Sequence, residues 1–223
     1  MFSYVFMKIL EMRPKSYDQR MDRISRGRVR AIKEAVAGEV PEGSHVLEIG
    51  CGTGALAALI IQRDCTVEGL DLSPSMVRAA EERIKRDNLS GKFSVRQLGI
   101  EAIDDFADEC FDSVVSTLVF TELNDDERRF AMKHAARILR PGGSIVIADE
   151  VVPQRAARRL IHALTRLPLL ALTYLISGKS TRPIEDLAGQ IGRAGFSVEK
   201  EVRSHADSFA IVVARKEEGK DPS

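Results

Sequence analysis

The stretch that decides the fold is Val46-Leu-Glu-Ile-Gly-Cys-Gly-Thr-Gly54. An apolar run ends there in three alternating glycines, and a helical pattern follows at once. This order is typical of a strand that enters a tight turn and then a helix N-terminus, where glycines let backbone N–H groups approach a ligand. A second apolar run, 65–70, ends in Asp71, 21 residues beyond Gly50. An acidic residue there can accept hydrogen bonds from a ribose diol, so the two runs predict a nucleoside-binding βαβ unit.

Strand-like and helix-like segments alternate through most of the chain, which predicts an α/β fold with a parallel sheet and helices on both faces. The expected strands are 45–50, 65–70, 93–98, 111–117, 144–149, 197–202 and 208–214. The expected helices are 74–87, 124–139, 153–176 and 183–194. At 223 residues the chain is expected to form one domain with additional segments on its surface.

Composition excludes several classes of function. The 33 basic and 33 acidic residues cancel, so no global field favours nucleic acid. Cys51, Cys65 and Cys110 are odd in number and form no C-x-x-C pair. They indicate neither a disulfide framework nor a metal site, and we expect a cytoplasmic protein. No stretch offers the ~20 uninterrupted apolar residues of a membrane span.

Two motifs carry a resemblance to a known family. Glu48-Ile-Gly-Cys-Gly-Thr-Gly resembles the first motif of class I S-adenosylmethionine (SAM) dependent methyltransferases, and Asp71-Leu-Ser-Pro-Ser-Met76 resembles the second. The segments 111–117 and 138–147 resemble the family's fourth strand and the turn into its fifth, so the resemblance covers about 17–196. It implies a Rossmann-like seven-stranded sandwich, mostly parallel, with an antiparallel last strand. The core also resembles the type 11 methyltransferases of ubiquinone and menaquinone biosynthesis.

The glycine spacing leaves a second cofactor open. A dinucleotide fingerprint needs G-x-G-x-x-G, and its third glycine is replaced here by Ala55. Alanine is sometimes accepted at that position, so spacing alone does not exclude an NAD(P)-binding oxidoreductase. The two methyltransferase motifs, in order and at this spacing, favour SAM, with S-adenosylhomocysteine as the product.

The resemblance implies a set of cofactor contacts at the strand ends. The residues expected to bind SAM are Tyr17, Glu48, Gly50, Cys51, Gly52, Gly54, Asp71, Leu72, Met76, Gly99, Ile100, Ser116 and Thr117. The glycines would approach the methionine moiety, and Asp71 would take the ribose hydroxyls. Leu72 and Met76 would pack against the adenine ring. Glu48 would order the loop or reach the amino group.

Several of these residues also have a simpler, purely structural interpretation. Glu48 can be paired with a nearby cation, and Asp71 can be a strand-end cap. Tyr17 can pack the N-terminal helix on the sheet, where many relatives use a Tyr-Asp pair to cover the cofactor. Ser116 and Thr117 can mark simple strand termination.

The sequence departs from the family after the third strand. Many members place an Asp there that bonds the adenine amino group, and Gly99 falls at that position. Gly99 and Ile100 can still contact adenine through backbone and apolar surface. A side-chain partner for the amino group is missing unless Glu101 or Gln97 moves in.

No residue is identified as catalytic. Methyl transfer from a sulfonium is an in-line displacement that depends mainly on alignment of donor and acceptor. Glu122, Asp149 and Glu150 follow strands at the carboxyl edge and can act as bases. Each is more simply structural in a chain this charged, and the four histidines form no constellation.

Substrate choice is expected to lie outside the sheet. We expect a helical arm or lid over 1–40, a SAM-binding core over 41–152, a helical substrate-side insert over 153–183, the end of the core over 184–216 and a frayed tail over 217–223. The apolar start of the chain indicates a packed arm or a homodimer contact. An arginine-rich, leucine-rich pattern in the insert fits a lid helix better than a peripheral membrane contact.

Three hypotheses about the partner follow. The segments 2–10 and 173–183 resemble the corresponding parts of methyltransferases associated with corrinoid proteins, which implies a protein-bound acceptor. The quinone-type core implies a lipophilic small molecule instead. A SAM-binding module without turnover, acting through protein contacts, is the third, and nucleic acid is not expected.

Overall fold

The computed structural model describes residues 16–155, 158–159, 183–204 and 207–217. Seven strands form one sheet in the order β3-β2-β1-β4-β5-β7-β6. Their bounds are β1 His45–Ile49, β2 Thr66–Leu70, β3 Phe93–Arg96, β4 Phe111–Thr117, β5 Leu139–Glu150, β6 Phe196–Ser204 and β7 Phe209–Lys216. β1 to β5 pair in parallel, and β7 is antiparallel to both β5 and β6. The expected Rossmann-like methyltransferase fold with an antiparallel last strand is confirmed.

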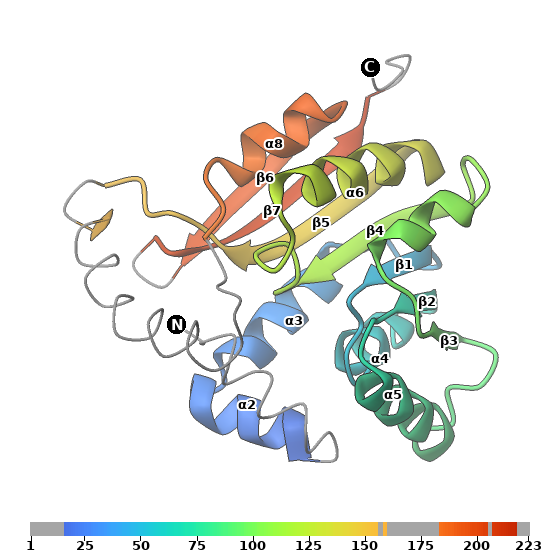
Figure 1. Ribbon diagram of the computed structural model, residues 1–223. Helices are drawn as coiled ribbons and strands as arrows, with labels where there is room; N and C mark the ends of the chain where they lie inside the picture. Colours follow the sequence, from blue (N-terminus) through green and yellow to red (C-terminus); the bar gives the residue numbers. More distant parts are fainter. Residues whose placement is uncertain (1–15, 156–157, 160–182, 205–206, 218–223) are drawn as a thin grey trace.

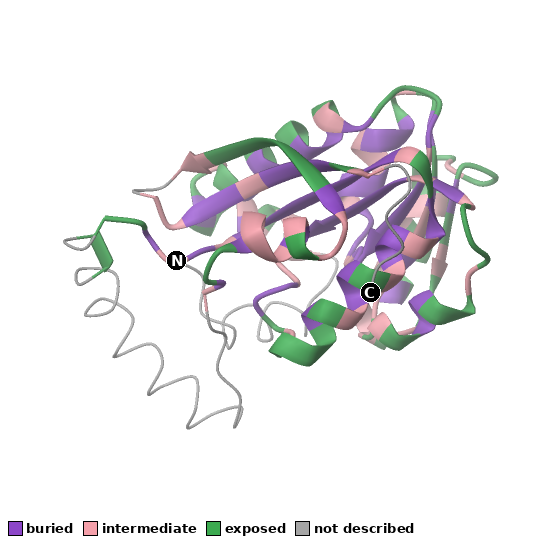
Figure 2. Cartoon of the chain, turned by 90° about the horizontal axis from the view of Figure 1, so that it is seen from above, coloured by how far each residue is buried: buried purple, intermediate pink, exposed green. Residues whose placement is uncertain are grey.

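Helices cover both faces of the sheet (Figure 1). The described helices are α2 Tyr17–Ser25, α3 Arg28–Glu39, α4 Ala55–Ile61, α5 Pro74–Arg86, the 3₁₀ helix η2 Ile100–Asp105, α6 Asp125–Ile138 and α8 Leu187–Arg193. One apolar core joins the sheet to η2, α6 and α8, and a second joins it to α3, α4 and α5. Figure 2 shows the buried strands between these layers. A sheet covered on both faces has strands that are buried on both sides, as β1 and β4 are along nearly their whole length.

The fourth expected helix, 183–194, is partly wrong. Ile184 forms a parallel bridge with Val151, so the chain runs beside β5 before the helix begins at Leu187. Asp186 adopts φ 51° and accepts a hydrogen bond from the Gly189 amide, which caps the helix. The long-range bridge and this cap take the place of the first helical turn. The expected helix 153–176 lies mostly outside the described residues.

The strand order places a site. The chain leaves β1 toward β2 and β3 on one side, then crosses to β4 on the other side. The connections therefore diverge between β1 and β4, and ligands of open α/β sheets bind at such a point, beyond the carboxyl ends of the strands.

Candidate functional site

A cavity lies where β1, β2 and β4 end. Its wall is contributed by the glycine turn after β1, the residue after β2, the loop after β4 and helices α2, α3 and α5. The lining residues are Tyr17, Val29, Lys33, Gly50, Cys51, Gly52, Thr53, Asp71, Met76, Thr117, Leu118, Val119 and Glu122. The structure thus brings seven of the thirteen expected cofactor residues to one cavity.

The three glycines of the turn have different structural roles. All have positive φ, at 71°, 54° and 72° for Gly50, Gly52 and Gly54, which L side chains rarely adopt. A Cβ at Gly50 would clash with Val119, and one at Gly54 would lie 2.5 Å from Phe93. A Cβ at Gly52 would meet nothing within 4 Å. Gly52 therefore presents open backbone, whereas Gly50 and Gly54 allow close packing around the turn.

Asp71 holds the glycine turn from the end of β2. One carboxylate oxygen accepts from the Gly52 amide at 2.8 Å, and the other accepts from the Ser73 amide at 2.8 Å. A carboxylate has about four acceptor sites, so these bonds are compatible with a ribose diol at the same group. The capping interpretation and the ribose interpretation of Asp71 are therefore not exclusive.

Glu48 lies beneath the turn, 1% exposed. Burial raises the pKa of this carboxyl from 4.5 to about 8, while the charge of Lys33 and the Ala57 backbone amide lower it. Its Oε2 atom has no hydrogen-bond partner among the described residues. An orphaned buried carboxyl oxygen under open glycine backbone fits the amino end of a SAM molecule.

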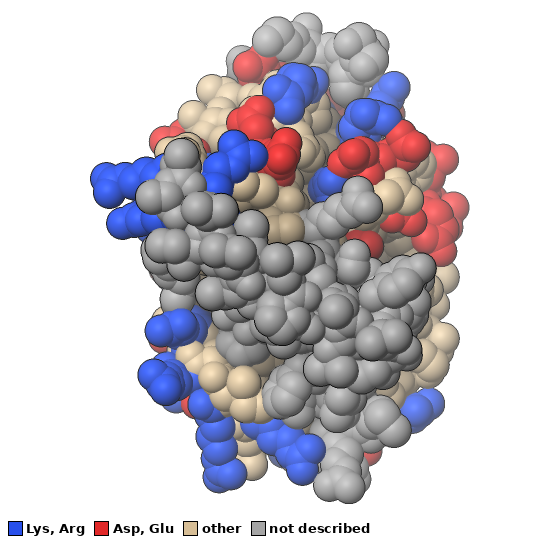
Figure 3. Space-filling model, turned by 60° about the vertical axis from the view of Figure 1, so that its left-hand side comes forward, with Lys and Arg blue, Asp and Glu red and all other residues tan. Residues whose placement is uncertain are grey.

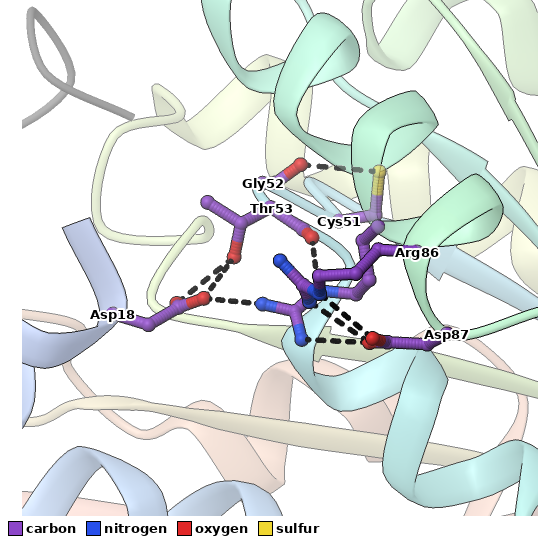
Figure 4. A network of polar contacts seen from close by, with 7 residues as sticks. Asp18, Cys51, Gly52, Thr53, Arg86 and Asp87 are labelled. Atoms are coloured by element: carbon purple, nitrogen blue, oxygen red, sulfur yellow. Dashed lines mark hydrogen bonds and ion pairs between the residues drawn. The ribbon is translucent and has the colours of Figure 1, made fainter. Parts of the chain in front are cut away.

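A polar network ties helix α2 to the turn (Figure 4). The Thr53 hydroxyl lies 2.9 Å from both carboxylate oxygens of Asp18 on α2. Arg83 on α5 donates to the Thr53 carbonyl at 2.7 Å and pairs with Asp18 at 2.5 Å. The network positions Tyr17, next to Asp18, at the cavity. The roles of Thr53 at the cavity and Arg83 in this network could not be predicted from the sequence, because neither residue stands out from its neighbours in the chain.

The expected adenine side is more open. Leu72 is 72% exposed and Met76 is buried. Gly99 and Ile100 do not line the cavity. The Glu101 carboxylate folds back against Gly99, where it occupies the space that a side chain at position 99 would fill. An acid is thus present at the place where the family's Asp is missing.

The other expected residues either line the cavity or are buried away from it. Thr117 lines the cavity. Ser116 is buried and donates to the Ile49 carbonyl at 3.0 Å, which links β4 to β1. Asp149 is fully buried, and both its oxygens bond Thr121. Burial raises the pKa of Asp149 to about 7, against the effect of the Glu150 amide and Thr121. Asp149 holds the loop after β4, so of the three candidate bases Glu122 is the one that reaches the cavity.

Among the described residues no group of three or more His, Cys, Asp or Glu is arranged to hold a metal ion. Within those same ranges, every helix is too short or too polar to cross a membrane.

The chain is similar to known proteins in both sequence and fold. Residues 46–143 match the model of a methyltransferase domain. A demethylmenaquinone methyltransferase of Tropheryma whipplei is 31% identical over 70% of this chain and 68% of its own length. An erythromycin 3''-O-methyltransferase of Saccharopolyspora erythraea is 31% identical over 78% of this chain but 57% of its own length. An O-methyltransferase family protein from Burkholderia thailandensis has the same fold, with a TM-score of 0.69 and 21% identity over 93% of this chain and 60% of that one.

Proposed function

This chain belongs to the class I SAM-dependent methyltransferases, and we propose that it transfers the methyl group to a small apolar acceptor. The observation that carries the proposal is the wall of the cavity beside the glycine turn. Val29 on α3 and Leu118 and Val119 after β4 line it, and Met21 and Val29 form a buried cluster with Leu118 packed against them. Such a wall favours an acceptor with apolar surface, because burying that surface stabilises the complex.

The residues present suggest how the reaction proceeds. SAM, when bound, supplies a methyl group already activated by a sulfonium charge. The protein aligns the two partners, and such positioning can contribute ~7–11 kcal/mol to lowering the barrier. The glycine turn and Asp71 hold one side, and the apolar wall excludes water from the other. Glu122 can take a proton from an acceptor that retains it at the working pH.

The relatives support an apolar acceptor. The Tropheryma whipplei relative is named for demethylmenaquinone, a lipophilic ring compound. The resemblance to corrinoid-associated methyltransferases rests on 2–10 and 173–183, of which only residue 183 is described. A corrinoid protein as acceptor therefore stays a prediction.

Charge on the surface is mixed. Figure 3 shows acidic side chains gathered at the upper right of one face and basic side chains mainly along its left and lower edges. Over the whole sequence the 33 basic and 33 acidic residues cancel, which supports a small-molecule acceptor over a nucleic acid, because nucleic-acid-binding domains are typically basic.

The test is a two-stage assay on the purified full chain. Calorimetric titration with S-adenosylhomocysteine and NADH comes first, and we expect only the adenosyl ligand to bind. Turnover with labelled SAM then compares a short-chain demethylmenaquinone, a macrolide and a corrinoid protein, with a reaction lacking the protein as the blank. Methylation of an apolar ring compound supports the proposal. Methylation of the corrinoid protein alone, or binding without turnover, contradicts it.

A further inference from the structure

We propose that Lys33 binds the carboxylate of the cofactor's amino-acid end. The inference rests on the methionine moiety lying at the glycine turn, and it is independent of the acceptor proposed above. Lys33 is the only Lys or Arg among the described residues that line the cavity with Gly50, Gly52 and Asp71. It therefore offers the one positive charge at the wall where an anionic group has to be satisfied.

The helix explains how Lys33 reaches the cavity. α3 spans Arg28–Glu39, and Ile32 and Val36 on it are buried in the core against the sheet. Val29 and Lys33 are one turn apart, and both line the cavity. Side chains four residues apart share one face of a helix. The stem of Lys33 can therefore follow the apolar surface of Val29 while its ammonium reaches the cavity.

The charges of the site fit a zwitterion. SAM's amino-acid end carries one ammonium and one carboxylate. The charged groups at the cavity wall other than Lys33 are Asp71 and Glu122, both acids. A ligand carboxylate placed near these acids alone would be repelled. Lys33 removes that conflict, because it offers the carboxylate a charge-assisted hydrogen bond.

Lys33 is also available for this role. Among the described residues no hydrogen bond or ion pair holds its ammonium. Its charge nevertheless lowers the pKa of both Glu48 and Cys51, which places it within electrostatic range of the floor of the turn. The Glu48 Oε2 atom beneath the turn, which has no partner among the described residues, and the Lys33 ammonium at the cavity wall thus offer an acceptor for the ligand's ammonium and a cation for its carboxylate.

The experiment pairs a change in the protein with a change in the ligand. Calorimetry measures S-adenosylhomocysteine and its decarboxylated analogue, S-adenosyl-3-thiopropylamine, on wild type, Lys33→Met and Lys33→Arg. Methionine keeps the stem and removes the charge. We expect Lys33→Met to weaken S-adenosylhomocysteine about tenfold to a hundredfold, the range for a hydrogen bond to a charged group. The decarboxylated analogue should change less than about threefold, and Lys33→Arg should retain most of the affinity.

The control is Lys85→Met, which removes an exposed lysine on α5 and should leave both affinities unchanged. Equal weakening of both ligands by Lys33→Met, or no weakening of either, would overturn the proposal. The wild-type protein supplies a test that needs no variant: equal affinity for the two ligands would also overturn it. Absence of binding by either adenosyl ligand would instead count against the cofactor site as a whole.

Discussion

Replacing Glu48 with glutamine should change how the stability of the protein depends on pH. Glu48 is 1% exposed, and burial raises the pKa of its carboxyl from 4.5 to about 8. Between these values the native state binds more protons than the unfolded chain. The free energy of unfolding therefore falls as pH rises through this window. Glutamine keeps the carbonyl oxygen for the Ala57 amide but does not titrate, so the variant should lack this part of the pH dependence.

The size of the effect follows from the two pKa values. The interval from 4.5 to about 8, at about 1.4 kcal/mol for each pH unit, sets a full loss on the order of 5 kcal/mol. About 3 kcal/mol of that loss should be present by pH 7. Asp149, whose pKa burial raises from 3.8 to about 7, adds a similar slope in both proteins. The difference between wild type and Glu48→Gln therefore isolates Glu48.

Urea unfolding at pH 5, 6, 7 and 8, extrapolated to water, measures this difference. The two proteins should be similar near pH 5, and the variant should become progressively the more stable of the two above it. Glu81→Gln, which alters an exposed acid on α5, is the matched control and should follow wild type throughout. If the curves for wild type and Glu48→Gln run parallel, Glu48 does not titrate across this window and the reasoning is wrong.

The remaining predictions concern the turn and the cofactor. Asp71→Ala removes the acceptor of the Gly52 amide and should weaken S-adenosylhomocysteine binding by ~1–3 kcal/mol in calorimetry; unchanged affinity would contradict the ribose placement. Thr53→Val and Asp18→Ala should show a coupling of about 1 kcal/mol in a double-mutant cycle read by urea unfolding, because each removes the same hydrogen bond; strictly additive losses would disprove the link. Glu101→Gln should reduce the preference for S-adenosylhomocysteine over its inosine analogue by about tenfold in competition binding. The reason is that the carboxylate beside Gly99, which we expect to accept a hydrogen bond from the adenine amino group, loses its charge. An unaltered preference would exclude that contact.

Much of the sheet could be predicted because its strands have local signals. The segment 111–117 begins with Phe111 and has Val114 and Val115 at its centre, and β4 has those same ends. β1 ends at Ile49, one residue before the expected end, because Gly50 adopts φ 71° and turns out of the strand. β5 begins at Leu139, before the expected 144, because Leu139 pairs with Phe111 across a register shift. That pairing joins residues far apart in the chain, so no local pattern contains it.

The cofactor side of the site was readable from the sequence for a similar reason. A glycine turn and an acid at the next strand end are short motifs whose geometry is fixed by the chain itself. The Asp18–Thr53–Arg83 network depends instead on three elements meeting in space. Nothing in the spacing of these three residues indicates that they meet.

Lys33 shows why the sequence could not supply the rest. A lysine four residues after a valine on an amphipathic helix is an ordinary pattern for a solvated face. What changes its meaning is the docking of α2 and α3 beside the loop after β4, where Leu118 packs against Met21 and Val29, so that Val29 and Lys33 line a cavity. The same docking sets the apolar wall of Leu118 and Val119 beside the glycine turn. Met21→Ala removes a buried side chain between α2 and α3 and should loosen both helices. It should therefore weaken acceptor binding and also reduce the preference for S-adenosylhomocysteine over its decarboxylated analogue. Asp71→Ala, by contrast, should leave acceptor binding unchanged.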